Sequence, residues 1–377
     1  MNKKGMSTVN LKKINHSRVY QYIYKSHLTS KQQIVQNLQM GLSTVSQNLS
    51  LLEQEGLIDR SGYFNSTGGR KAQAIRIVPD FKIAIGIGIL KDMFHITAVD
   101  LYGNAICTAT IFQSYADSPD YYKEVTDQIK HFISSNHYKE EQILGISIAT
   151  QGTTSSDNTT VMYGTIMHNT GMNVEDFSRY LPYPCRLEHD SKAAAFLELW
   201  NRPELDSAIV YLLNPNLGGA IITDRHIHHG ISMHSGSLEH MCINPDGPIC
   251  YCGSRGCLET YCSANALLQA ANLSADEFFK ILRKNESPQI NVLWKDYLDH
   301  LAFAIKNLNM IIDAPVIISG YLAPYFKEED IQYMLTSINS SSIFALHKDQ
   351  ILIGTHGHYT PAIGAALYYV DHFIRQI

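Results

Sequence analysis

Three cysteines and one histidine lie close together in the sequence, around two glycines. They are His240, Cys250, Cys252 and Cys257. Three thiolates and one imidazole form a complete tetrahedral zinc site with no vacant position, so the pattern predicts a structural metal rather than a catalytic one. The alternative is a cluster of reduced thiols or a disulfide. We favour zinc, because a Cys-x-Cys pair rarely suits a disulfide and the glycines permit a tight metal loop.

The spacing of these residues is also distinctive. Extended to Glu259, it reads His-x9-Cys-x-Cys-Gly-x-x-Gly-Cys-x-Glu. This segment resembles the signature of the ROK family, which comprises bacterial sugar kinases and sugar-responsive transcriptional repressors, and the resemblance runs along most of the chain. It implies one structural zinc ion per chain and an α/β body of two lobes, of the actin/hexokinase type, with a sugar cleft between them.

The same resemblance indicates which residues would contact a sugar. The kinases place their catalytic base in an Asn-Asp pair before an Ala-rich helix; here His189 replaces the asparagine and Asp190 matches the base. In the family's Gly-Glu-x-Gly-His segment, Ser237 replaces the glutamate and His240 is kept. One ring nitrogen of His240 can bind metal while the other donates to a ligand. With Glu259 as another sugar-contacting carboxylate, we expect an altered polar pocket for a hydroxylated ligand.

Other roles for these and neighbouring residues stay open. Asp190 or Ser191 could simply cap the helix that follows, and Glu239 could supply a replacement carboxylate. Four histidines lie in a loop-like segment and are expected to face solvent rather than a ligand. They are His226, His228, His229 and His234.

Both ATP-binding elements of the kinases are degraded. Their Asp-x-Gly-Gly-Thr motif corresponds to four residues around Ile89, which are Gly88, Leu90, Lys91 and Asp92. A phosphate cradle needs backbone N–H groups free of side-chain bulk, so Leu90 obstructs it and Asp92 repels phosphate. The second loop, Gly-Thr-Gly-x-Gly-Gly-Gly in the kinases, reads Asn-Pro-Asn-Leu-Gly-Gly-Ala over residues 214–220, where the proline removes a donor. We therefore predict that the protein is not an enzyme.

Composition and charge indicate the cellular compartment of the protein and the class of its binding partner. The chain of 377 residues has a net charge of -5, yet residues 1–76 contain eleven Lys/Arg and three Asp/Glu, whereas the remainder contains 19 and 32. A basic head on an acidic body suggests a nucleic-acid contact confined to the head. Seven cysteines, no apolar run of about 20 residues and a polar N-terminus predict a cytoplasmic protein without a membrane partner.

The basic head has the pattern of a winged helix–turn–helix. Helices are expected over residues 17–25, from Ser30 with a capping box, and over 43–55. The last should bury Val45, Leu49 and Leu52 and present polar residues that can contact bases or phosphates. The candidate DNA contacts are Ser43, Thr44, Ser46, Gln47, Asn48, Ser50 and, on the wing, Arg70 and Lys71.

An ordinary three-helix bundle with a polar face is the alternative for the head. The segment Gly56-Leu57-Ile58 argues against it, because it ends the helix and begins an apparent wing. The wing carries Ser-Thr-Gly-Gly-Arg-Lys over 66–71, and small residues followed by cations suit a phosphate backbone. This order of elements resembles the heads of ROK repressors, which ROK kinases lack.

The body alternates strands and helices, which predicts an α/β architecture. Strands are expected over 81–99 (two), 143–149, 207–213, 220–223, 316–319 and 350–353, and helices over 121–136, 191–201, 293–310 and 362–373. We place the domains at 1–80 for the head, 81–190 for the first lobe, and 191–377 for the second lobe with the zinc segment and a returning C-terminal helix.

These observations together predict a sugar-responsive transcriptional regulator, acting as a repressor. Its partners would be a double-stranded DNA operator, a carbohydrate effector bound between the lobes, and further copies of the chain in a homodimer or higher oligomer. One alternative is a ROK sugar kinase with an added DNA-binding head. Another is a regulator that answers to a phosphorylated metabolite or a protein partner, with the sugar pocket vestigial.

Overall fold

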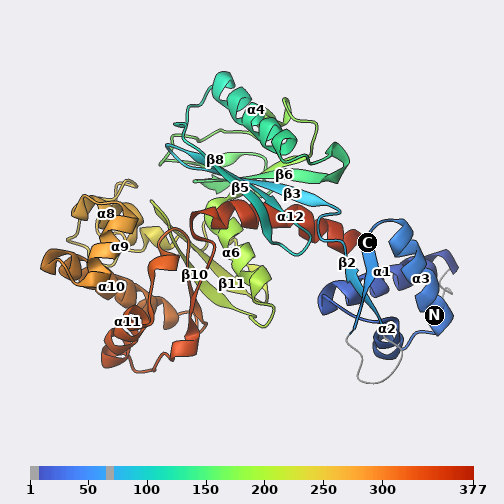
Figure 1. Ribbon diagram of the computed structural model, residues 1–377. Helices are drawn as coiled ribbons and strands as arrows, with labels where there is room; N and C mark the ends of the chain where they lie inside the picture. The colour runs from blue at the N-terminus through green and yellow to red at the C-terminus, as the bar shows by residue number, and fades with distance from the viewer. Residues whose placement is uncertain (1–7, 65–71) are drawn as a thin grey trace, which may run out of the picture.

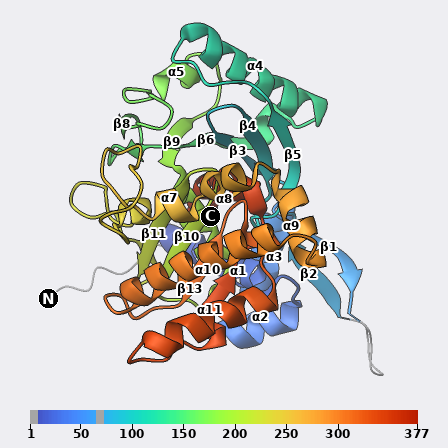
Figure 2. The ribbon, with the colours of Figure 1, turned by 90° about the vertical axis from the view of Figure 1, so that its left-hand side faces the viewer.

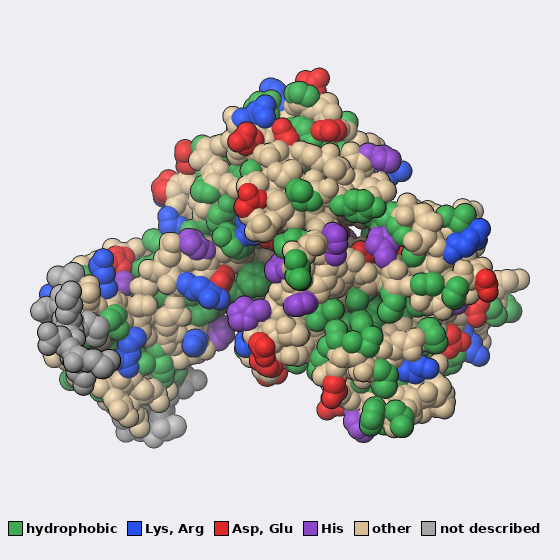
Figure 3. Space-filling model, turned by 180° about the vertical axis from the view of Figure 1, so that it is seen from behind, with side chains coloured by type: hydrophobic (Ala, Val, Ile, Leu, Met, Phe, Trp, Pro, Cys, Tyr) green, Lys and Arg blue, Asp and Glu red, His purple; other side chains and the backbone are tan. Residues whose placement is uncertain are grey.

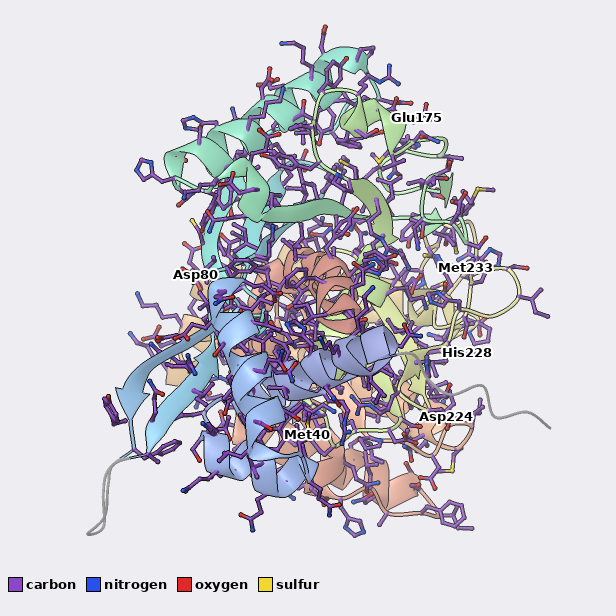
Figure 4. The ribbon with its side chains drawn as sticks, turned by 90° about the vertical axis from the view of Figure 1, so that its right-hand side faces the viewer. Met40, Asp80, Glu175, Asp224, His228 and Met233 are labelled. Carbon is purple, nitrogen blue, oxygen red and sulfur yellow. The ribbon has the colours of Figure 1, made fainter. Side chains whose placement is uncertain are left out.

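The computed structural model describes residues 8–64 and 72–377, which form a head and a two-lobed body (Figure 1). The chain passes from the head into the first lobe near Asp80 (Figure 4). Both the head and the body are built from mixed helices and strands, as the sequence predicts. Within the described ranges, no helix combines the length and the apolar character needed to cross a membrane.

The head consists of three helices and a two-stranded wing. They are α1 (Thr8–Ser26), α2 (Lys31–Leu38), α3 (Leu42–Gln54), β1 (Ile58–Tyr63) and β2 (Gln73–Ile77). The predicted capping box is confirmed, since the Ser30 hydroxyl accepts from the Gln33 amide and the Gln33 side chain accepts from the Ser30 amide. Gly56 turns the chain from α3 into the wing at φ 77°, where a Cβ would lie 3.1 Å from the Phe81 ring, so this turn requires glycine.

A five-stranded sheet forms the first lobe, in the order β5-β4-β3-β6-β9. The strands are β3 (Ile83–Ile89), β4 (Phe94–Val99), β5 (Ala105–Ile111), β6 (Ile143–Thr150) and β9 (Cys185–His189). Helix α4 (Pro119–Ser135) covers one face and α12 (Thr360–Gln376) the other (Figure 1). All seven residues of β3 are therefore buried. Beyond the sheet lie the short elements β7 (Thr153–Thr154), β8 (Val161–Tyr163) and α5 (Glu175–Ser178).

The second lobe has its own five-stranded sheet, in the order β12-β11-β10-β13-β14. The strands are β10 (Ala208–Leu213), β11 (Leu217–Thr223), β12 (His226–Ile227), β13 (Val316–Ser319) and β14 (Ile351–Ile353). Five helices pack beside it and face the viewer in Figure 2; they are α7 (Glu259–Cys262), α8 (Ala264–Ala271), α9 (Ala275–Lys284), α10 (Pro288–Asn309) and α11 (Glu328–Ser341).

Two helices in the centre of the molecule pack against each other, α6 (Asp190–Asn201) and α12. Gly364 permits their close approach, since a Cβ there would lie 1.8 Å from the Ala193 carbonyl oxygen. Gly86 on β3 permits the same for the sheet and α12, since a Cβ there would lie 1.8 Å from the Ala362 carbonyl oxygen. The C-terminal end of α12 reaches the head, where the Gln21 side-chain amide donates to the Ile374 carbonyl. One hydrophobic core thus spans the head and the central helices.

Candidate functional site

The four predicted metal ligands come together in the second lobe. The ligand atoms of His240, Cys250, Cys252 and Cys257 all lie within 4.8 Å of one another. The Cys252 and Cys257 sulfurs are 3.7 Å apart, and the Cys250 sulfur is 3.9 Å from His240 Nδ1. Zinc bonds of about 2.3 Å to sulfur and 2.1 Å to nitrogen place tetrahedral ligands about 3.6–3.8 Å apart, whereas a disulfide requires about 2.05 Å. The geometry therefore fits a metal site and excludes a disulfide between Cys252 and Cys257.

Glycine positions give the metal loop its shape. Gly253 has φ 88° and Gly256 has φ 66°, and a Cβ on Gly256 would lie 1.6 Å from the Asn244 carbonyl oxygen. The Cys250 amide donates to the Ser254 carbonyl at 2.8 Å, which closes the turn between the cysteines. These turns bring three sulfurs to one side, as the sequence predicts.

The two ring nitrogens of His240 face different surroundings. Nδ1 faces the Cys250 sulfur, while Nε2 lies 3.5 Å from the Tyr251 hydroxyl and 3.9 Å from Glu239 Oε1. A histidine whose Nδ1 binds metal presents its Nε2–H to whatever lies on the other side. Here that side is a pocket, so His240 belongs to both sites.

The pocket has a volume of about 540 Å³ and is lined by residues of both lobes. The first lobe contributes Gln151, Gly152, Thr153, Met162, Tyr163, Thr165, Ile166 and His189; the remaining lining residues are Asp190, Ser191, Asn216, Leu217, His234, Ser237, Glu239, His240 and Tyr251. Four of the five predicted sugar contacts therefore lie together in its wall, namely His189, Asp190, Ser237 and His240. The additional carboxylate considered above, Glu239, lines it too.

Glu259 is not among the residues that line the pocket, and its expected contact with a ligand stays a prediction. Its side chain is buried and accepts hydrogen bonds from Asn216 Nδ2 at 2.8 Å and from the Leu217 amide at 2.6 Å. Asn216 in turn lies 3.4 Å from the Gln151 side-chain amide of the first lobe. Glu259 thus fixes the loop that forms the pocket floor and bridges the two lobes.

Burial changes the protonation of the groups around the pocket. It raises the pKa of Asp190 to about 6 and that of Glu239 to about 8, and it lowers the pKa of His189 to about 3. At neutral pH, Asp190 is thus mostly ionised, Glu239 mostly protonated and His189 neutral. Glu239 Oε2 and His189 Nδ1 are buried without a hydrogen-bond partner in the described protein. Buried polar atoms need partners, and a hydroxylated ligand would supply them.

A model of the ROK family matches residues 83–371, which include the pocket and the metal loop. The chain belongs to the ROK family. The xylose repressor of Bacillus subtilis (strain 168) is 24% identical over 385 residues, covering 97% of this chain and 97% of the repressor.

Solved ROK structures share the fold. A ROK transcriptional regulator, a homologue of the E. coli MLC protein, matches with a TM-score of 0.73 at 17% identity and covers 97% of both chains. A ROK glucokinase from Streptomyces griseus, in complex with glucose and AMPPNP, matches with a TM-score of 0.64 at 19% identity. That match covers 76% of this chain and 98% of the kinase. These likenesses confirm the predicted α/β class and the two-lobed body.

Little open space remains at the end of β3, the position of the first ATP-binding motif in ROK kinases. Gly88 and Leu90 border a space of only about 10 Å³, about the minimum that one water needs. The ring of His95 lies 4.7 Å from that of His358 and 5.0 Å from that of Tyr359, at the start of α12. Aromatic side chains thus occupy the end of β3 where the kinase motif would bind phosphate.

The DNA-contact candidates on α3 do not all face outward. Ser43, Gln47 and Ser50 are exposed, while Thr44 and Ser46 are half-buried. Asn48 is buried, and its side-chain amide donates to the Thr44 carbonyl at 2.8 Å, so its placement on the outer face was wrong. The wing candidates Arg70 and Lys71 lie outside the described residues.

The loop after β11 contains the four histidines that were expected to face solvent. His226 and His228 are exposed, and Figure 4 shows His228 and Met233 along the outer edge of this loop. His234 is also exposed, as expected, although it lines the pocket, whereas His229 is half-buried and departs from the expectation. In Figure 3, histidine side chains gather in the middle of the body, where the lobes meet.

Several pocket residues were not recognised from the sequence. Gln151 and Tyr163 come from the loop after β6 and from the β7–β8 hairpin, segments without a distinctive motif. Asn216 lies in the degraded phosphate loop, where the sequence indicated only a loss of ATP binding. Tyr251 could have been found, because it lies between Cys250 and Cys252 and next in sequence to the predicted metal cluster.

Proposed function

We propose that the protein is a sugar-responsive DNA-binding transcriptional regulator, a repressor, and not an enzyme. The observation that carries this proposal is a single hydrophobic core that joins a winged helix–turn–helix head to a body with a polar pocket. The full-length similarity to a xylose repressor supports it. The filled space at the end of β3 argues against the kinase alternative. The expected assembly is a homodimer on a palindromic operator, whose two half-sites take one head each.

The metal at the Cys/His site is proposed to be zinc, one ion per chain. Three thiolates and one imidazole leave no open position, so zinc would be structural. When bound, it would fix the loop that carries Tyr251 and the ring orientation of His240. In this way the ion would shape one wall of the pocket without itself contacting the ligand.

The contacts of α6 suggest how the pocket communicates with the head. This helix begins at Asp190 in the pocket, and near its other end the Trp200 indole donates to the Tyr102 carbonyl at 2.9 Å. The Tyr102 ring stacks on Tyr24 and His27 of the head, with ring centroids 5.3 and 4.6 Å apart. A ligand that closes the lobes would move α6, and this contact would transmit the movement to the head.

The head is tested by replacing Gln47 with alanine. Residues in the N-terminal part of a recognition helix contact base edges, and losing one bidentate contact costs about 1–3 kcal/mol. We therefore expect Q47A to weaken operator binding by about 5- to 150-fold in gel-shift titrations at moderate salt. The matched control is Q54A, an exposed glutamine at the opposite end of α3. The proposal fails if wild-type protein shows no sequence-specific DNA binding that a sugar changes.

The proposed communication between the pocket and the head is tested by replacing Trp200 with phenylalanine. The variant leaves the Tyr102 carbonyl without its donor, which costs about 1–3 kcal/mol of stability. We expect W200F to bind sugar and operator as wild type does, but with a several-fold smaller effect of sugar on operator affinity. The matched control is W294F, because Trp294 also loses a buried hydrogen bond, to Asp330, but in the second lobe. An equal loss of response in both variants would contradict the proposed route.

A further inference from the structure

The pocket is lined by polar groups at its bottom and by large apolar side chains at its mouth. Asp190 and Glu239 are each only 8% exposed, and they provide polar atoms at depth. Met162, Tyr163 and Tyr251 line the same pocket but are 60%, 53% and 37% exposed. Single exposed apolar side chains are common on protein surfaces. Three large ones that converge on one polar pocket indicate a second surface for ligand contact.

The two tyrosines face the pocket from opposite lobes. Tyr163 ends β8 in the first lobe, and Tyr251 lies between two cysteines of the metal loop in the second. Tyr251 is held against His240, with ring centroids 5.2 Å apart and its hydroxyl 3.5 Å from Nε2. Tyrosine offers a large rigid apolar face at small cost in conformational entropy. The C–H faces of a pyranose or furanose ring fit such a face.

The size of the pocket exceeds that of one sugar ring. A water molecule takes about 30 Å³ in the liquid, so the about 12 non-hydrogen atoms of a hexose occupy at most roughly 360 Å³. The pocket measures about 540 Å³. In this arrangement of the lobes, a monosaccharide bound by the deep polar groups would therefore leave the space beside Tyr163 and Tyr251 unfilled. A second ring would fill it.

We propose that the effector is a disaccharide, an inference that rests on the proposed function. One sugar ring binds at depth through hydrogen bonds to Asp190, Ser237, Glu239 and His240. The second ring packs at the mouth between Tyr163 and Tyr251. The polar groups at the bottom of the pocket recognise the hydroxyl pattern of the first ring. The two tyrosines at the mouth distinguish a disaccharide, which has a second ring, from a free monosaccharide.

Calorimetry on the full-length metal-loaded protein tests this. The probes are maltose, cellobiose, lactose, xylobiose and diacetylchitobiose, each compared with its component monosaccharides and their methyl glycosides. We expect one disaccharide to bind at least tenfold more tightly than its monosaccharides and methyl glycosides. Tyr163→Ala should remove most of that difference, because it should lower the affinity for the disaccharide several-fold more than the affinity for its monosaccharides. The control is Phe112→Ala, which removes an 80% exposed ring of the same lobe that does not line the pocket.

The possible results separate a failure of the disaccharide inference from a failure of the proposed function. A monosaccharide that binds as tightly as every disaccharide overturns the disaccharide inference and leaves the proposed function standing. Equal losses for both ligand classes in Tyr163→Ala, or no loss in either, also overturn it. If none of the probes binds and none changes operator affinity, the proposed function fails together with the inference.

Discussion

Replacing Cys257 with serine is expected to abolish stoichiometric metal binding and to destabilise the second lobe strongly. Cys257 is fully buried, and its sulfur lies 3.7 Å from that of Cys252. Its loss leaves three ligands and a buried hydroxyl where a thiolate should be. A metal present at a thousandfold its dissociation constant stabilises the native state by about 4 kcal/mol, so we expect C257S to lose about that much. Metal content by mass spectrometry and thermal unfolding measure the two effects.

The same variant should also lose affinity for the effector, because His240 and Tyr251 would no longer be fixed in the pocket wall. The matched control is Cys242→Ser. Cys242 is exposed and is not a member of the four-ligand group, although it lies in the same loop region. C242S should keep its metal, its melting temperature and its ligand affinity. Unchanged zinc content in C257S would contradict the ligand assignment.

The cluster of three cysteines and one histidine could be predicted because its chemistry is local. Three thiols and an imidazole within one short segment have few other uses, and the glycines between them predict the loop that gathers them. The head was predictable for a similar reason, since capping and helical periodicity are properties of neighbouring residues. In both cases the interactions that form the structure join residues close together in the sequence.

Asn48 was expected on the outer face of its helix and Glu259 in contact with a ligand, and the structure gives both side chains partners within the chain. Asn48 is polar, but it lies at i+3 from Val45 and i−4 from Leu52, so helical geometry places it on the buried face. There its amide bonds the Thr44 carbonyl. Glu259 is satisfied by Asn216 and Leu217, some forty residues earlier. Such a partnership between distant residues cannot be read from the sequence around either one.

The strands that were missed have weak local signals. Strand β5 is an edge strand with four half-buried and three exposed residues, so its hydrophobic alternation is poor. Strand β9 is short and mixes charged and apolar residues; its pairing with β6 holds it in the sheet. Helices α8, α9 and α11 were overlooked although Ser274 provides a regular capping box for α9. Pairing with a strand that is distant in the sequence, rather than local propensity, determines that a segment such as β9 becomes a strand.

Replacing Asp190 with asparagine is expected to lower carbohydrate affinity about 10- to 100-fold while leaving operator binding without sugar unchanged. Asp190 is the first residue of α6, and its Oδ1 accepts from the Ser191 amide at 2.6 Å and the Ser191 hydroxyl at 3.0 Å. A carboxylate has about four acceptor positions, so the group retains capacity for a ligand hydroxyl. A hydrogen bond to a charged group contributes about 1.5–3 kcal/mol, and the amide would present a donor instead.

Calorimetry at pH 7.5 measures the affinity, since a carboxyl with a pKa of about 6 is mostly ionised there. The matched control is Asp224→Asn on the exposed loop after β11, where asparagine tolerates the φ of 51°. The competing view, that Asp190 only caps α6, makes a different prediction. It requires D190N to lower the melting temperature and keep full affinity for the sugar. An intact melting temperature with lost affinity instead places Asp190 in direct contact with the effector, at the start of the helix that ends beside the DNA-binding head.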